Sequence, residues 1–200
     1  QPVVVERLGS ALSPANRLQV RKRGPGTLYL TAALDSYTSG DPIPAESQGP
    51  LRLTRDYFRL RVESGRDGAP RWNLEPLTGV LRSGDLIISR LTLTGDRARY
   101  LLVEDPIPAG CEQVTSAAGI DWALAPGPWQ EGFQHREFRD QRTVFFVDYF
   151  SGKAVFQYAM RVQIPGEWKV APARGERMYQ PEVEANSASG TFQIVDRQQE

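Results

Sequence analysis

Residues 142–166, RTVFFVDYFSGKAVFQYAMRVQIPG, decide the fold class of this chain. In the first half, Phe145, Val147 and Tyr149 occupy every second position, which is the period of a strand with one face buried. After the Ser-Gly pair at 151–152, the second half is again rich in aromatic and β-branched residues. We therefore predict two antiparallel strands joined as a β-hairpin at 151–152.

The rest of the chain has the same short-strand character. Its fifteen prolines and eighteen glycines interrupt the sequence every few residues, and no run between them keeps a 3.6-residue period. The clearest further strand candidates are 51–63, 83–95, 99–110 and 191–196. About eight or nine strands joined by short turns predict an all-β chain, folded as an antiparallel β-sandwich of immunoglobulin-like shape.

The strand candidate at 83–95 changes phase part of the way along. Leu86 and Ile88 occupy one set of alternating positions, whereas Leu91 and Leu93 occupy the other set. Since all four are candidates for the inward face, we predict a β-bulge between Ile88 and Leu91.

The N-terminal part of the chain is predicted to belong to a different β module. Residues 17–23 and 27–34 flank a Gly-Pro-Gly turn and alternate apolar with polar side chains, which predicts a hairpin of half-buried strands. Residues 35–50 are rich in Gly, Pro, Ser and Asp, as linkers and long surface loops are. We predict that residues 1–45 hold terminal strands of a preceding module plus a linker, and that residues 46–200 form the main sandwich.

Composition narrows the range of functions. Hydrophobic residues make up 40% of the chain, charged residues 24%, and the formal net charge is zero, so we expect neither disorder nor electrostatic binding to nucleic acid. The sequence has no apolar run of the roughly eighteen residues that a membrane span needs, so this segment is not expected to insert into a membrane. It begins with Gln1, and any export signal is expected to lie outside it.

Few residues suggest chemistry. The single histidine, His135, and the single cysteine, Cys111, leave too few nitrogen and sulfur ligands for a typical zinc site. His135 and Glu137 match the H-x-E of zinc deaminases, but the paired cysteines of that signature are missing. Glu104 and Asp105 stand beside prolines at a strand end, where carboxylates commonly serve turns and caps. We expect no catalytic residue, no metal and no cofactor.

One loop is a candidate contact with a partner protein. Trp122 and Trp129 flank the proline-rich segment ALAPGP, and Phe133 follows closely. Large aromatic side chains are enriched at protein interfaces. Packing of the loop onto the sandwich is the alternative, and it is the commoner use of such residues.

Several segments together resemble a known family. They are RLTRDYFRL, GDLIISRLTLTGDRARYLLVEDPIPAGCE, HREFRD with the aromatic strands after it, and PARGERMYQPEVEANSASG before the last strand. In this order, over about residues 51–196, they resemble the C-terminal macroglobulin-like domain of bacterial alpha-2-macroglobulins. Residues 1–45 are similar to the strands that precede this domain in the same proteins.

The resemblance implies a non-catalytic domain of an exported, periplasmic inhibitor that entraps many kinds of protease after they cut a bait segment. The implied partners are the other domains of the parent macroglobulin, and proteases bound through the full-length protein. Some relatives are linked to a penicillin-binding protein, and some lack the reactive thioester. In such a protein the domain would instead be a docking module for a specific periplasmic partner. Any anchor in the inner membrane would lie in a part of the protein that is not shown.

The segment PAGCEQV, residues 108–114, contains the residue types of an internal thioester at a different spacing. In macroglobulins the thioester joins Cys and Gln three positions apart within a helical domain. Cys111 and Gln113 are two positions apart in a predicted strand, about 7 Å from each other along one face. We predict that Cys111 is a free, buried thiol that serves as a small hydrophobic side chain.

Overall fold

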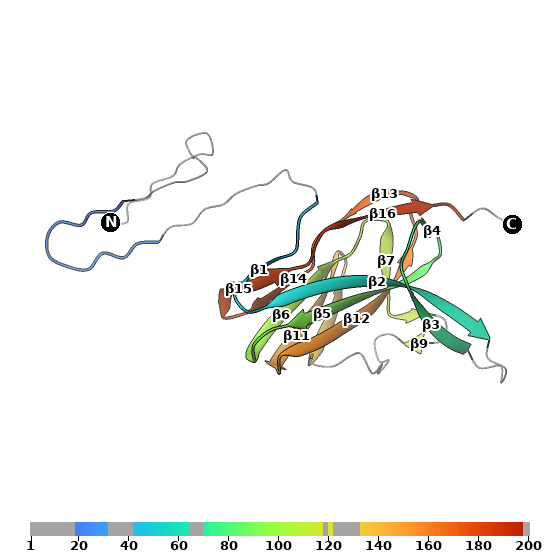
Figure 1. The fold of residues 1–200 in the computed structure, drawn as a ribbon, viewed down its shortest axis with the longest axis horizontal. Helices are drawn as coiled ribbons and strands as arrows, with labels where there is room; N and C mark the ends of the chain where they lie inside the picture. Colours follow the sequence, from blue (N-terminus) through green and yellow to red (C-terminus); the bar gives the residue numbers. More distant parts are fainter. Residues whose placement is uncertain (1–18, 32–41, 65–69, 118–119, 122–132, 198–200) are drawn as a thin grey trace. The chain divides into compact units, whose positions relative to one another are not determined.

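A computed structural model describes residues 19–31, 42–64, 70–117, 120–121 and 133–197 (Figure 1). The chain divides into two compact units, Gln1–Ser39 and Gly40–Glu200. In these residues no helix is long and apolar enough to cross a membrane.

The first unit does not contain the predicted hairpin in its described part. Residues 19–31 form a bend at 24–26 and no strand, and all of them are exposed, including Val20, Leu28 and Leu30. The prediction of half-buried strands is therefore wrong for these residues. A two-stranded hairpin is only marginally stable in water without an apolar face to pack against, and residues 19–31 by themselves offer no such face. The assignment of residues 1–45 to a preceding module stays a prediction.

The second unit is built from short β-strands. Those in the described residues are β1 (Glu46–Gln48), β2 (Arg52–Ser64), β3 (Pro70–Pro76), β4 (Leu81–Arg82), β5 (Leu86–Thr94), β6 (Ala98–Pro106), β7 (Cys111–Val114), β8 (Ser116–Ala117), β9 (Ile120–Asp121), β10 (His135–Arg139), β11 (Arg142–Phe150), β12 (Lys153–Val162), β13 (Gly166–Val170), β14 (Arg174–Arg177), β15 (Gln180–Asn186) and β16 (Gly190–Val195). β1 lies inside the predicted linker, where it pairs with β15.

Two sheets form the layers of the sandwich (Figure 1). One has the strand order β1-β15-β14-β6-β11-β10, and the other has the order β3-β2-β5-β12-β7. A third sheet, β13-β16-β4, contains the parallel pair β16–β4, and a two-stranded sheet pairs β8 with β9. The other described strand pairs are antiparallel, which confirms the predicted antiparallel sandwich.

One hydrophobic core joins the three larger sheets. Phe156 comes from the five-stranded sheet, Phe145 from the six-stranded sheet, and Phe192 from the three-stranded sheet. The rings of Phe145 and Phe156 meet with their centroids 4.9 Å apart. Full burial of one such side chain stabilises the fold by roughly 1.5–3 kcal/mol relative to exposure.

The strands β11 and β12 do not pair with each other, so the predicted hairpin at 151–152 is wrong. β11 lies between β6 and β10, and β12 lies between β5 and β7 in the other layer. The chain crosses between the layers at Gly152, which has a φ of 112° that favours glycine. The strands therefore present Phe145 and Phe156 to each other across the core. Two strands in opposite layers show the same alternation of apolar residues as the two strands of a hairpin, so the sequence pattern could not distinguish the two arrangements.

The predicted bulge in β5 is also wrong, because both neighbouring strands keep a continuous register along it. Ile87, Leu91 and Leu93 face the main core, whereas Ile88 faces a second cluster with Leu60 and Ala159. The change of phase arises because this central strand buries apolar side chains on both faces.

The connection from β6 to β7 depends on a close approach at Gly110. A Cβ atom at this position would lie 2.5 Å from Nε1 of Trp168 and 2.8 Å from Cδ1 of Ile194. The Trp168 indole is itself held by a hydrogen bond from Nε1 to the carbonyl oxygen of Ile164, at 2.8 Å. Only glycine fits here without displacing the indole.

We expect Gly110→Ala to lower the free energy of unfolding by about 1–3 kcal/mol, because an added methyl group overpacks this contact. Urea denaturation followed by circular dichroism measures the change. Gly190→Ala is the matched control, since its Cβ would lie an ordinary 3.9 Å from Val170. Equal losses in the two variants would contradict the proposed role of the Trp168 contact.

Candidate functional site

The most strongly constrained polar group is the carboxylate of Asp105. This residue lies near the end of β6 and is fully buried. Its oxygens accept hydrogen bonds from Arg55 Nη1 at 2.7 Å, from Ser89 Oγ at 2.7 Å and from Tyr158 Oη at 2.8 Å. The three donors belong to β2, β5 and β12. The predicted turn or capping role is wrong for Asp105, because the side chain points into the sandwich together with Leu101 and Val103.

Arg55 extends this network beyond the two main sheets. Its side chain is 3% exposed, and it also donates to the carbonyl oxygens of Ala171, at 2.8 Å, and Ala188, at 3.3 Å. Burial by itself would lower the pKa of Arg55, but the neighbouring Tyr57 and Asp105 raise it above the usual value. Burial, with the negative charge of Asp105, raises the pKa of Tyr158 well above its usual value. We conclude that this cluster joins strands, since its carboxylate is closed off from any substrate in solution.

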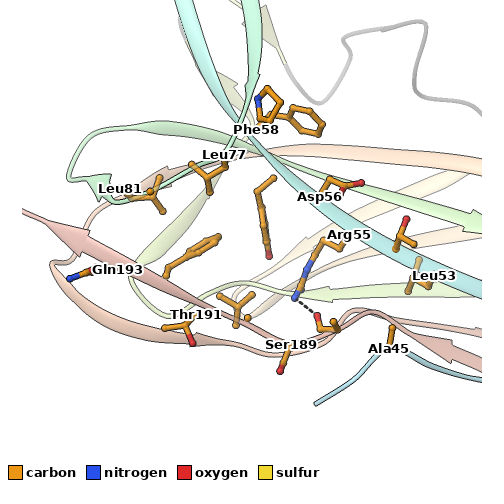
Figure 2. A pocket seen from close by; sticks show the side chains of 18 residues that line it. Ala45, Leu53, Arg55, Asp56, Phe58, Leu77, Leu81, Ser189, Thr191 and Gln193 are labelled. Atoms are coloured by element: carbon orange, nitrogen blue, oxygen red, sulfur yellow. Dashed lines mark hydrogen bonds between the residues drawn. The ribbon is translucent and has the colours of Figure 1, made fainter. Parts of the chain in front are cut away.

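A groove of about 730 Å³ lies beside Arg55, with β2 and β16 lining it (Figure 2). Tyr57 and Phe192 lie along it with their rings in edge-to-face contact, the centroids 4.8 Å apart. In the described part of the chain, β2 pairs with β3 only from Phe58 onward, so residues 52–56 pair with β5 alone. The groove therefore runs along a strand edge that has free backbone hydrogen-bonding groups.

A second exposed feature lies at the start of β6. Tyr100 has a φ of 56°, which is unusual for a non-glycine residue and costs about 1–3 kcal/mol. Its carbonyl oxygen accepts a hydrogen bond from the backbone N–H of Met178, at 2.8 Å, and its ring meets that of Tyr179 edge to face, with centroids 5.6 Å apart. Tyr179 is 78% exposed, Tyr100 43% and Met178 42%. We call these three residues the Tyr100–Tyr179 surface.

The residues predicted to contact a partner are only partly covered by the structure. Trp122 and Trp129 lie outside the described residues. Phe133 packs against the core, and its ring meets that of Phe145 edge to face with centroids 5.3 Å apart. A contact between Phe133 and a partner stays a prediction.

The residues considered for metal chemistry form no common cluster in the described part of the chain. His135 Nε2 lies 3.6 Å from the Glu137 carboxylate on β10, an edge strand of the six-stranded sheet. Across the residues that the structure describes, no three His, Cys, Asp or Glu side chains gather as metal ligands would.

Cys111 is a free cysteine whose side chain is partly buried against the core. Burial raises the pKa of its thiol to about 12, from a usual value of 9.0. The Gln113 side chain is engaged elsewhere, since its amide nitrogen donates to the carbonyl oxygen of Arg139 at 2.9 Å. The two residues thus take part in separate contacts, and the thiol behaves as a small side chain at the edge of the core.

Comparison with known proteins agrees with this architecture. The family described as "Bacterial Alpha-2-macroglobulin MG10 domain" matches residues 51–182. An alpha-2-macroglobulin of Xylella fastidiosa is 27% identical over 190 residues, covering 89% of this chain and 11% of that protein. An alpha-2-macroglobulin of Ralstonia nicotianae is 30% identical over 196 residues, covering 83% of this chain and 12% of that protein. A "Circularly permutated Ras protein 2" of Dictyostelium discoideum is 27% identical over 174 residues, covering 85% of this chain and 4% of that protein.

Solved structures show the same fold. A crystal structure of a Salmonella alpha-2-macroglobulin mutant matches with a TM-score of 0.59 and 26% identity, covering 79% of this chain and 10% of that one. The structure of the native conformation of Escherichia coli alpha-2-macroglobulin matches with a TM-score of 0.61 and 24% identity, covering 80% of this chain and 10% of that one. The fold is therefore that of a macroglobulin-type β-sandwich domain.

The family match settles which such domain this is. Because it covers residues 51–182, the chain belongs to the bacterial alpha-2-macroglobulin MG10 domain family, as the sequence resemblance predicted. The chain spans only 4–12% of the length of the curated relatives above, so it corresponds to a small part of much longer proteins.

Two features were not predicted, although the sequence contains a signal for each of them. The inward positions Leu101 and Val103 of β6 predict, by their period of two, that Asp105 is also inward. The pair Met178-Tyr179 stands in a polar turn, where two large side chains have no local apolar partners in sequence. Such a pair is a signal for an exposed contact surface.

We expect Asp105→Asn to lower the free energy of unfolding by about 3–5 kcal/mol, because it leaves the buried Arg55 charge without its partner. Chemical denaturation at pH 7 measures the loss. Glu104→Gln is the control: it breaks the more exposed Glu104–Arg142 pair, 3.1 Å long, and should cost at most about 1 kcal/mol. A loss below about 1 kcal/mol in Asp105→Asn would contradict the role of the buried pair.

Cys111 should react slowly with iodoacetamide in the native state. At pH 8 a pKa of about 12 leaves about 10³-fold less thiolate than the usual pKa of 9.0, and thiolate is the reactive form. The native rate should keep rising with pH toward 12, whereas the rate in urea should level off near pH 9. Mass spectrometry of the labelled chain measures both. Equal rates in buffer and in urea at pH 8 would contradict burial of the thiol.

Proposed function

We propose that this chain is a non-catalytic interaction domain of a bacterial alpha-2-macroglobulin, a broad-spectrum protease-trapping inhibitor of the cell envelope. Membership of the MG10 domain family supports the parent protein, and the share of the relatives that the chain covers supports a place among other domains. We further propose that the parent protein is periplasmic, which membership of this family supports. Trapping of proteases belongs, in this proposal, to the full-length protein.

The Tyr100–Tyr179 surface is the observation that carries the interaction role. Tyrosine and methionine are enriched at protein interfaces, and aromatic residues dominate the binding energy of many of them. The hydrogen bond from Met178 to Tyr100 holds the turn against β6, so the exposed rings are presented in a fixed position. Exposed rings held in this way lose little conformational entropy on binding. We therefore propose that another domain of the parent macroglobulin docks here.

Tyr179→Ser in the full-length protein should weaken docking by about 2 kcal/mol or more, as expected at an interface hot spot. Hydrogen exchange should then become faster across residues 98–101 and 177–180. The isolated chain should keep its stability within about 0.5 kcal/mol, because Tyr179 is exposed in it. Ile164→Ser is the control, since Ile164 is 55% exposed and lies beside Gly110, beyond the other end of β6.

Two results would contradict this function. One is unchanged exchange at the Tyr100–Tyr179 surface of full-length Tyr179→Ser. The other is inhibition of trypsin by the isolated 200-residue chain, since trapping is assigned to the whole protein.

A second candidate function is a docking module for a specific periplasmic partner, such as a penicillin-binding protein, in a macroglobulin without thioester trapping. The groove along the free edge of β2 favours it, because an extended peptide can add to such an edge through backbone hydrogen bonds. Pull-down from a periplasmic extract tests this candidate, with Thr54→Pro in β2 and the double variant Trp122→Ala and Trp129→Ala beside the unmodified chain. Equal recovery of the partner by the double variant would reject the aromatic loop as its contact.

A further inference from the structure

A small cleft adjoins the Tyr100–Tyr179 surface. It has a volume of about 320 Å³ and is lined by Ala98, Arg99, Tyr100, Arg177, Tyr179 and Gln180. This volume lies at the lower end of the range of roughly 300–1,000 Å³ for sites that hold small ligands. The cleft is therefore large enough for a side chain of a partner, but not for a bulky ligand.

The charge of the cleft is positive and is not balanced by its own residues. Two arginines line it, and no Asp or Glu does. In the described part of the chain no carboxylate pairs with Arg99 or Arg177, whereas the nearby Arg174 pairs with both Glu176 and Glu184. Arg177 Nη1 donates to Gln180 Oε1 at 2.9 Å, and its buried Nε has no hydrogen-bond partner among the described residues.

A partner that covers this surface must compensate the positive charges of Arg99 and Arg177. Taking an arginine out of water without a counter-charge is strongly unfavourable, and a negatively charged group within hydrogen-bonding distance offsets that penalty. The guanidinium fork suits a planar carboxylate, with two parallel N–H···O bonds. Tyr100 and Tyr179 also line the cleft, and a phenol hydroxyl is a further hydrogen-bond donor for an anion. The zero formal net charge of the chain gives no long-range attraction for a polyanion such as nucleic acid.

We propose that the Arg99–Arg177 cleft binds the carboxylate of an Asp or Glu side chain on the domain that docks against the Tyr100–Tyr179 surface. This inference rests on the proposed function, and it adds the chemistry of the partner: an acidic residue next to an apolar patch. The tyrosine rings and Met178 bury apolar area, while the two arginines select for the acidic residue and fix its position.

The direct test is a nuclear magnetic resonance titration of the ¹⁵N-labelled chain with acetyl-Gly-Glu-Gly-amide. We expect saturable shifts of the Arg99 and Arg177 Nε–H signals, with a Kd of roughly 1–30 mM, as suits one side chain. The peptide acetyl-Gly-Gln-Gly-amide has the same shape without the charge and should cause no saturable shift. The double variant Arg99→Gln and Arg177→Gln should bind at least about fivefold more weakly, whereas Arg97→Gln, a nearby exposed arginine outside the cleft, should bind normally.

Several results would overturn the proposal. These are equal shifts with the glutamine peptide, unchanged binding by the double variant, or tighter binding of inorganic phosphate, which would point to a phosphorylated ligand. Docking measurements on variants of the full-length protein distinguish this inference from the proposed function on which it rests. If Tyr179→Ser weakens docking and the double arginine variant does not, the acidic contact is wrong and the docking surface stands. If neither change affects docking, both are wrong.

Discussion

The buried carboxylate of Asp105 is the constraint on which the rest of the sandwich depends. The hydrophobic effect is not directional, so a core of apolar side chains alone tolerates several alignments of two packed sheets. A buried charge does not, because it is stable only where its donors meet it. Arg55, Ser89 and Tyr158 come from three neighbouring strands of the five-stranded sheet, and Asp105 comes from the opposite layer. Their hydrogen bonds therefore fix where β6 crosses that sheet.

The same interaction shapes the groove in Figure 2. Arg55 reaches past Asp105 to the carbonyl oxygens of Ala171 and Ala188, which lie just outside β13 and β16. The three-stranded sheet is thereby tied to β2 by side-chain contacts, since β2 and β16 belong to different sheets and share no ladder of backbone hydrogen bonds. A site for an extended peptide at this edge would thus depend on a guanidinium that the peptide need not touch.

Much of this architecture could be predicted from the sequence, and each failure has a physical reason. Alternation of apolar residues gave the strands and the antiparallel sandwich, because burial of one face sets that period. It could not tell a hairpin from a crossing between layers at Gly152, since both leave the same pattern. It also suggested a bulge between Ile88 and Leu91, because a central strand buries both of its faces. Asp105 was misjudged because its donors Arg55 and Tyr158 are about fifty residues away on either side.

The strand β6 connects the buried network to the surface that we propose as functional. Asp105 lies near its end and Tyr100 near its start, five residues or about 17 Å apart along an extended strand. Tyr100 has an unfavourable φ, and such a conformation persists only where the surroundings fix it. The surroundings here are the pairing of β6 with β11 and β14 and the hydrogen bond from Met178. Since the Asp105 network fixes β6 at its other end, one rigid strand carries the strain at Tyr100 and holds its ring in a fixed position at the surface. The stability of the buried charge and the precision of the exposed surface are therefore properties of the same element.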